Sequence, residues 1–330
     1  MSVTAPRATL HDPTLDAFID ETRQMNELVA AFQAQVPGFD TPEGLAALRE
    51  ANGFFGRAEV DGVALRDIPG PAGQIPARVL VPAAYPGTPV DAVHLDLHGG
   101  GWCIGSAQGE DANNQQLADT ANVVVVAIDY RLAPEDPFPA GPDDCFATVC
   151  WLLEHAAHEW GTDRLVIGGA SAGAHLAAVT LLRVRDELGA DALARIAGAN
   201  LLFGPYDLGL TPSQRDANDS LIIPLDTLEA VYHHVLPGVD REARRDPRWS
   251  PLYADLSGLP PALFTVGTLD PLYDDSLFMA ARWRAAGNDA TLRVYPESLH
   301  AFPAFPTEMG RHATTMMHEW IRGIAGAGTA

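Results

Sequence analysis

The residue types that carry out acyl transfer, a serine, an aspartate and a histidine, occur in this sequence within recognisable local patterns. Ser171 is the centre of the pentapeptide Gly169–Gly173, which follows the apolar run Leu165–Ile167 and opens a helix of small residues. The pattern G-x-S-x-G between a strand and a helix holds a nucleophilic serine on a sharp turn, where tiny neighbours let strand and helix approach each other. Ser171 is therefore the candidate nucleophile, although the pentapeptide alone also fits a small-residue turn with an incidental serine.

A serine nucleophile of this kind requires a histidine and an acid, and both follow later strands. Asp270 comes just after the apolar run Leu263–Val266, and His300 follows the strand pattern Thr291–Tyr295. Because the carboxyl ends of parallel strands meet at one edge of a sheet, we expect both side chains to lie beside the Ser171 turn. His300 is then the general base and Asp270 the residue that orients it. Asp274 and Asp275 remain alternative acids.

The glycine run His98–Trp102 directly follows the strand pattern Val90–Leu97. Three consecutive glycines carry an entropy cost and pack nothing, so they indicate backbone N–H groups that face a ligand. Acyl transfer requires such donors for its oxyanion, supplied by an HGGG turn and by the residue after the nucleophile, here Ala172. The alternative is a phosphate-binding loop, but no lysine follows and no G-x-G-x-x-G opens a helix.

Charge and composition exclude several classes of function. The 330 residues include 43 acidic and 21 basic side chains, a formal net charge of −22, and every basic residue is arginine. Such an acidic chain repels phosphate backbones and anionic lipid, so we expect no nucleic acid partner and no stable membrane association. The absence of lysine excludes Schiff-base chemistry and Ser–Lys hydrolysis. No metal or cofactor is expected.

The cysteines and the N-terminus indicate the cellular compartment. Cys103, Cys145 and Cys150 form no CxxC pair, which fits a reducing cytoplasm better than a disulfide framework. The first twelve residues are polar and resemble no signal peptide, and no apolar run approaches the ~20 residues of a membrane span. We therefore expect a cytoplasmic protein.

The order of elements predicts an α/β fold with a mostly parallel sheet covered by helices on both faces. Residues 1–50 have helical spacing, with Thr41 as the N-cap of a short helix that begins at Pro42. The predicted strands are 75–81, 90–97, 123–128, 165–167, 196–203, 263–266 and 291–295. The further predicted helices are 146–159, 172–188, 275–286 and 307–324. The proline-rich stretch 205–250 interrupts this alternation and is predicted to be an insertion, with a helical segment around 225–236.

These motifs resemble the hormone-sensitive-lipase-like family of carboxylesterases, the bacterial family IV type of the α/β-hydrolase fold. The resemblance covers His98–Trp102, the stretch 129–140 with its DYRLAPE sequence, Gly169–Gly173, Asp270–Leu272 and His300, in the family's order. It implies an oxyanion hole of Gly100, Gly101 and Ala172, with Gly99 less certain. It also implies cap helices in 1–50, a catalytic core of 51–204 and 251–330, and a cap insertion in 205–250. A homodimer is a further expectation from the family.

Two residues depart from the family pattern: Ala170 replaces the usual Asp or Thr before the nucleophile, and Ala301 replaces the usual Gly after the histidine. In the DYRLAPE stretch, Arg131 and Glu135 are expected to pair and pin a loop behind the glycine turn. The other histidines are expected to be structural, with His98 ordering the glycine turn. The candidate residues for lining the substrate pocket are Trp102, Phe32, Leu221 and Tyr232.

The sequence thus predicts a serine carboxylesterase for short- to medium-chain esters that acts through an acyl-enzyme. Its small-molecule partner is the ester substrate. Amide or lactone cleavage by the same triad is the alternative within hydrolases. A non-catalytic small-molecule receptor on the same fold is the alternative outside them, but such a receptor typically loses a triad residue, and all three positions are filled here.

Overall fold

The computed structural model describes residues 10–33, 38–51 and 60–327. Parts of the predicted N-terminal segment, including residues 1–9, therefore lie outside the described residues. The strands are β1 (Ala64–Gly70), β2 (Gly73–Leu80), β3 (Ala92–Leu97), β4 (Val123–Ile128), β5 (Leu165–Ala170), β6 (Ile196–Leu202), β7 (Ala262–Gly267) and β8 (Ala290–Tyr295). The helices are α1 (Ile19–Gln33), α2 (Pro42–Glu50), α3 (Asp111–Ala121), α4 (Ala140–Trp160), α5 (Ala172–Arg183), α6 (Ala190–Leu193), α7 (Pro212–Arg215), α8 (Leu225–Val235), α9 (Tyr273–Ala285) and α10 (Glu308–Gly326).

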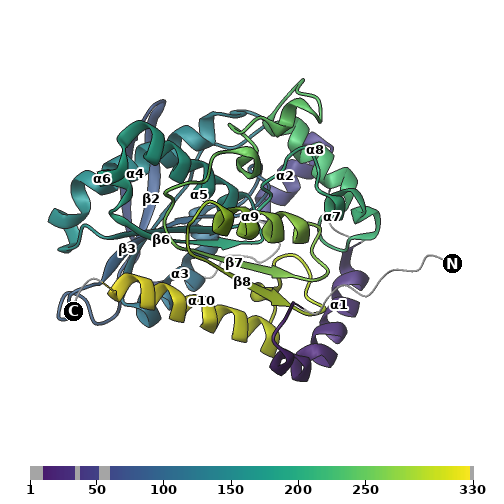
Figure 1. The fold of residues 1–330 in the computed structure, drawn as a ribbon, viewed down its shortest axis with the longest axis horizontal. Helices are drawn as coiled ribbons and strands as arrows, with labels where there is room; N and C mark the ends of the chain where they lie inside the picture. The colour runs from purple at the N-terminus through teal and green to yellow at the C-terminus, as the bar shows by residue number, and fades with distance from the viewer. Residues whose placement is uncertain (1–9, 34–37, 52–59, 328–330) are drawn as a thin grey trace.

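The strands form one mixed sheet in the order β1-β2-β4-β3-β5-β6-β7-β8. The pairs β1–β2 and β2–β4 are antiparallel, whereas every pair from β4 to β8 is parallel. Helices α3 and α10 pack together on one face, and α4, α5 and α9 lie on the other (Figure 1). This arrangement confirms the predicted α/β-hydrolase architecture.

Strand β4 explains why both faces must be covered. Its sequence VVVVAI is buried throughout. Successive side chains of a strand point to opposite faces, and accordingly Val124 and Val126 join the larger core cluster with α4 and α5. Val123 and Val125 instead join Leu117 and Ile321 on the face of α3 and α10. The continuous β-branched run therefore supplies apolar surface to two separate layers.

Strand β1 and helices α3, α6 and α7 were not predicted, and one helix begins earlier than predicted. Strand β1, with the sequence ALRDIPG, is largely exposed with only Ile68 buried, and it lacks the alternation of apolar and polar residues that marks a strand. Helix α3 is polar and buries Leu117 as its one large apolar side chain. Helix α4 begins at Ala140 rather than at the predicted Phe146. The sequence did not indicate this start because the first turns of the helix carry no apolar spacing. Among the described residues, no helix has both the length and the apolar character that crossing a membrane requires.

The two segments predicted to form a cap meet above the glycine turn. In the N-terminal segment, the Thr41 side chain accepts the Gly44 N–H and caps α2, as predicted. The segment between β6 and β7 contributes α7 and α8. A hydrogen bond of 2.9 Å joins the His234 ring to the carbonyl of Phe39, linking the two segments directly.

Candidate active site

Ser171 lies at the turn between β5 and α5 in a backbone conformation that non-glycine residues rarely adopt, with φ 55° and ψ −117°. The turn is possible only because Gly169 and Gly173 lack side chains. A Cβ on Gly169 would lie 2.2 Å from the carbonyl oxygen of Leu97, and one on Gly173 would lie 1.7 Å from it. The hydroxyl is thus held at the carboxyl end of the sheet on a half-buried residue.

The three predicted side chains form a continuous chain of hydrogen bonds. The Nε2 of His300 lies 3.0 Å from the Oγ of Ser171, and its Nδ1 lies 2.9 Å from the Oδ2 of Asp270. A carboxylate can only accept, so Nδ1 carries the proton and Nε2 is free to accept from the serine hydroxyl. Asp270 is buried, and its Oδ1 accepts the N–H of Leu272, which fixes the carboxylate.

The alternative acids have partners elsewhere. Asp274 accepts the N–H of Ser213, and Asp275 accepts hydrogen bonds from residues of the segment between β6 and β7. Neither carboxylate is hydrogen-bonded to His300, whereas Asp270 is. The geometry therefore favours Asp270 as the partner of the imidazole.

The glycine turn lies directly against the serine. A Cβ added to Gly99 would lie 3.1 Å from the carbonyl oxygen of Ala170 and 3.7 Å from the Cβ of Ser171. Gly100 has φ +113° and Gly101 φ +58°, so both adopt conformations that favour glycine. Ala172 is the first residue of α5, where a backbone N–H has no acceptor within the helix.

His98 orders the glycine turn, as predicted. Its Nδ1 is 2.7 Å from the carbonyl of Gly99, and its ring stacks on Tyr130 with centroids 4.3 Å apart. The Tyr130 hydroxyl in turn donates to the carbonyl of His98 at 2.8 Å. Burial lowers the pKa of His98 below its ordinary value, so the ring is neutral at pH 7.

The predicted pairing of Arg131 with Glu135 is wrong. Arg131 forms its ion pair with the buried Asp144, at 2.9 Å, and also donates from its backbone to that carboxylate. The carboxylate of Glu135 instead accepts hydrogen bonds from both terminal nitrogens of Arg49. Each side chain therefore finds a partner from a separate element, although both do pin the loop behind the glycine turn.

The residues suggested as pocket lining have different environments. Tyr232 is completely buried and donates to Gln214 at 3.0 Å, which corrects its assignment as a lining residue because no surface remains for a substrate. Trp102 is also buried, with its ring edge-on to Phe138. Leu221 is half-buried, and Phe32 on α1 is 63% exposed.

Residues that the sequence did not single out also lie against the site. Val231 on α8 and Phe39 lie 3.2 and 3.8 Å from the position a Gly101 Cβ would take, so they cover that glycine. The ring of Phe203 meets the His300 ring edge-on at 4.7 Å. Phe203 directly follows β6, so the rule that placed Ser171, Asp270 and His300 at strand ends also applies to it.

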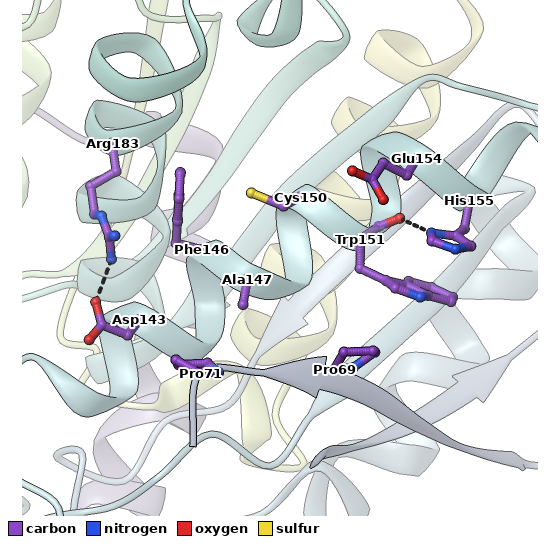
Figure 2. A pocket seen from close by; sticks show the side chains of 10 residues that line it. All are labelled: Pro69, Pro71, Asp143, Phe146, Ala147, Cys150, Trp151, Glu154, His155 and Arg183. Carbon is purple, nitrogen blue, oxygen red and sulfur yellow. Dashed lines mark hydrogen bonds and ion pairs between the residues drawn. The ribbon is translucent and has the colours of Figure 1, made fainter. Parts of the chain in front are cut away.

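An open groove on the surface is separate from this site. It lies between α4, the end of α5 and the β1–β2 turn, and Figure 2 shows Arg183 pointing to Asp143 at one end and Trp151 beside His155 at the other. None of the proposed triad or oxyanion residues lines it. The groove therefore plays no part in assigning the chemistry at Ser171.

Comparisons with known proteins agree with this architecture. A family model described as the α/β-hydrolase fold matches residues 94–304. The carboxylic ester hydrolase LipN of Mycobacterium tuberculosis is 37% identical over 245 residues, or 71% of this chain, but the match spans only 62% of LipN. The esterase LipI of the same organism is 32% identical over 89% of this chain and 92% of its own length.

A solved structure extends the likeness to nearly the whole chain. The hyperthermophilic esterase of the archaeon Pyrobaculum calidifontis superposes with a TM-score of 0.74 at 26% identity, covering 96% of this chain and 99% of that one. Together with the sheet order and the match across the core, these likenesses confirm the expected family. The chain belongs to the α/β-hydrolase fold family, in its hormone-sensitive-lipase-like branch.

Proposed function

We propose that this protein hydrolyses small carboxylic esters, with Ser171 as the nucleophile. The observation that carries the proposal is the unbroken hydrogen-bond chain from the Ser171 hydroxyl through His300 to Asp270, at 3.0 and 2.9 Å. A serine, a base and an orienting acid within hydrogen-bond reach of one another are the arrangement that activates a hydroxyl for acyl transfer. The names of the relatives LipN and LipI, a carboxylic ester hydrolase and an esterase, support the same reaction.

In this mechanism, His300 accepts the hydroxyl proton as Ser171 Oγ attacks the ester carbonyl carbon. The tetrahedral intermediate collapses when His300 returns the proton to the leaving alkoxide, and an acyl-enzyme and an alcohol result. Water, deprotonated by His300, then attacks the acyl-enzyme and releases the carboxylic acid and free serine. Asp270 holds the imidazole with its Nδ1 proton inward and stabilises its charged form in both halves of the reaction.

The oxyanion of each intermediate is proposed to accept hydrogen bonds from the backbone N–H groups of Gly100, Gly101 and Ala172. The left-handed conformations of the two glycines and the position of Ala172 at the start of α5 support this assignment. Such donors cost no reorganisation when charge develops, and each contributes roughly 3–4 kcal/mol to transition-state stability.

We further propose that the N-terminal helices and the insertion 205–250 form a cap over this site. Val231 and Phe39 come from those two segments and lie against Gly101, which leaves limited room beside the oxyanion turn. This supports a preference for short to medium acyl chains. A homodimer and a cytoplasmic location remain predictions from the sequence.

The test is hydrolysis of a series of p-nitrophenyl esters from acetate to decanoate by the wild type and by Ser171→Ala. We expect turnover by the wild type that is highest for the shorter chains, and a loss of at least about 10⁴-fold in kcat in the variant. Undiminished hydrolysis by Ser171→Ala would remove Ser171 from the mechanism. Faster cleavage of matched anilides than of the esters would assign the site to amides instead.

A further inference from the structure

Arg49, in the last turn of α2, reaches across to the glycine turn and to the loop behind it. Its Nε donates to the carbonyl of Cys103 at 2.8 Å, and one terminal nitrogen donates to the carbonyl of Ala133 at 2.9 Å. Both terminal nitrogens also hold Glu135 as a bidentate pair at 2.8 Å. One side chain therefore joins three separate points of the molecule.

The placement of α2 explains how Arg49 can make these contacts. Leu45 and Leu48 are buried and belong to the same core cluster as Trp102, Cys103 and Ile104. The helix is thus anchored in the main hydrophobic core, to which the segment that continues the glycine turn also belongs. Arg49 directly follows the buried Leu48, and its side chain stays 32% exposed.

The glycine turn requires support from outside. Besides its two left-handed glycines, Trp102 has φ 59°, a conformation that a bulky residue keeps only when its surroundings enforce it. Within the turn, Gly100 accepts the N–H groups of Cys103 and Ile104 at 3.1 and 3.0 Å. The carbonyl of Trp102 accepts the N–H of Ala133 at 2.9 Å, which ties the turn to the loop that Arg49 also holds.

We propose that Arg49 is a positioning residue for the oxyanion turn. From helix α2 it holds Gly100–Trp102 in place by donating hydrogen bonds to the carbonyls of both Cys103 and Ala133. The guanidinium suits this role because its donors lie in one rigid plane, so the two carbonyls and the carboxylate of Glu135 are held in a fixed mutual arrangement. The inference rests on the proposed function, since its effect is on the stabilisation of an oxyanion.

The test compares Arg49→Met, which removes all these bonds, with Arg49→Lys and Glu135→Gln. Arg66→Met is the matched control, because Arg66 pairs with Glu159 at 2.6 Å on a partly exposed surface that none of the proposed site residues shares. For Arg49→Met we expect kcat on p-nitrophenyl acetate to fall about 10- to 100-fold with KM within about threefold, because a displaced donor acts in the transition state. Arg66→Met should match the wild type.

The other two variants separate positioning from general loss of stability. Arg49→Lys should recover part of kcat, and Glu135→Gln should lose less than Arg49→Met because the bonds to Cys103 and Ala133 remain. A phenylboronic acid, which mimics the tetrahedral intermediate, should bind more weakly to Arg49→Met by the same factor as the fall in kcat/KM.

Several outcomes would overturn the proposal. One is a kcat of Arg49→Met equal to that of Arg66→Met, and another is a loss confined to KM. If Arg49→Met does not fold, Arg49→Lys decides: a melting temperature like that of the wild type with an unchanged kcat would refute the positioning role. Failure of the proposed function is distinguishable, because then the wild type would not hydrolyse the ester, or Ser171→Ala would hydrolyse it equally well.

Discussion

Asp275 on α9 accepts a hydrogen bond of 2.7 Å from the side chain of Gln214, on α7. The same carboxylate accepts the Thr211 hydroxyl and the backbone N–H groups of Tyr206 and Asp207. Gln214 extends this hydrogen-bond network to α8, because its Oε1 accepts a hydrogen bond from the Tyr232 hydroxyl. A single buried acid thus ties the segment between β6 and β7 to the helix that follows Asp270.

Exchanging Asp270 and Asp275 for asparagine should therefore have different effects, the first on catalysis and the second on stability. Asp270→Asn should lower kcat by about 10³- to 10⁴-fold with little change in melting temperature, because the imidazole loses tautomer control. Asp275→Asn should instead lower the free energy of unfolding by about 1–3 kcal/mol, since an amide nitrogen cannot accept the bonds from Thr211 and Gln214. The measurements are ester turnover per titrated active site and thermal melting. The reverse pattern would make Asp275 the catalytic acid.

The close approach of Gly173 to the carbonyl of Leu97 gives a second prediction. A Cβ at this position would lie 1.7 Å from that oxygen, so Gly173→Ala must displace either α5 or β3. Because the displacement would move the Ser171 turn, we expect loss of most activity and a fall of several kcal/mol in the free energy of unfolding, of the order seen for overpacked cores. Ester hydrolysis and urea denaturation would measure the two effects.

Gly323 provides the matched control for this exchange. It lies inside α10 and an added Cβ would meet nothing within 4 Å. Gly323→Ala should therefore leave activity unchanged and stabilise the protein by about 0.5–1 kcal/mol through helix propensity. Equal behaviour of the two alanine variants would show that the contact with Leu97 does not constrain the turn.

The sequence was sufficient to predict that the three candidate side chains lie together, because each of them follows its own strand. Ser171, Asp270 and His300 follow β5, β7 and β8, and the parallel order of those strands brings their ends together. Local chemistry determined the rest of that prediction: only glycine tolerates the backbone approach at positions 169 and 173. Neither step required knowledge of side-chain packing.

Contacts between distant segments could not be predicted in the same way. Tyr232 was chosen as a lining residue, yet its neighbour Val231 covers Gly101 while Tyr232 points into the core. Adjacent residues of a helix point about 100° apart, so the choice depends on the phase of α8, which the sequence does not fix. Likewise, the nearness of Arg131 and Glu135 in sequence suggested that they pair with each other. Instead, Arg131 pairs with Asp144 of α4, and Glu135 pairs with Arg49 of α2.

The buried His175, one turn after Ser171, gives a prediction for stability against pH. Burial lowers its pKa to about 4, and its Nε2 donates to the carbonyl of Trp249 at 2.7 Å. In the unfolded chain a histidine titrates near 6.5. Between these values the unfolded state binds a proton that the folded state does not, so His175 makes stability fall as the pH drops from about 6.5 to 4.

The variant His175→Gln isolates this effect, because glutamine can still donate to Trp249 but does not titrate. Asp96 and Asp275, whose pKa values burial raises to about 7, act in the opposite sense, since they favour the folded state as the pH falls. They are common to both proteins and cancel in the comparison. Urea denaturation at pH values from 4.5 to 7 should therefore show that the unfolding free energy of the wild type falls relative to that of the variant as the pH drops, by up to about 1.4 kcal/mol per pH unit. Parallel plots would mean that folding does not change the pKa of His175, against its burial between Trp102 and Phe138.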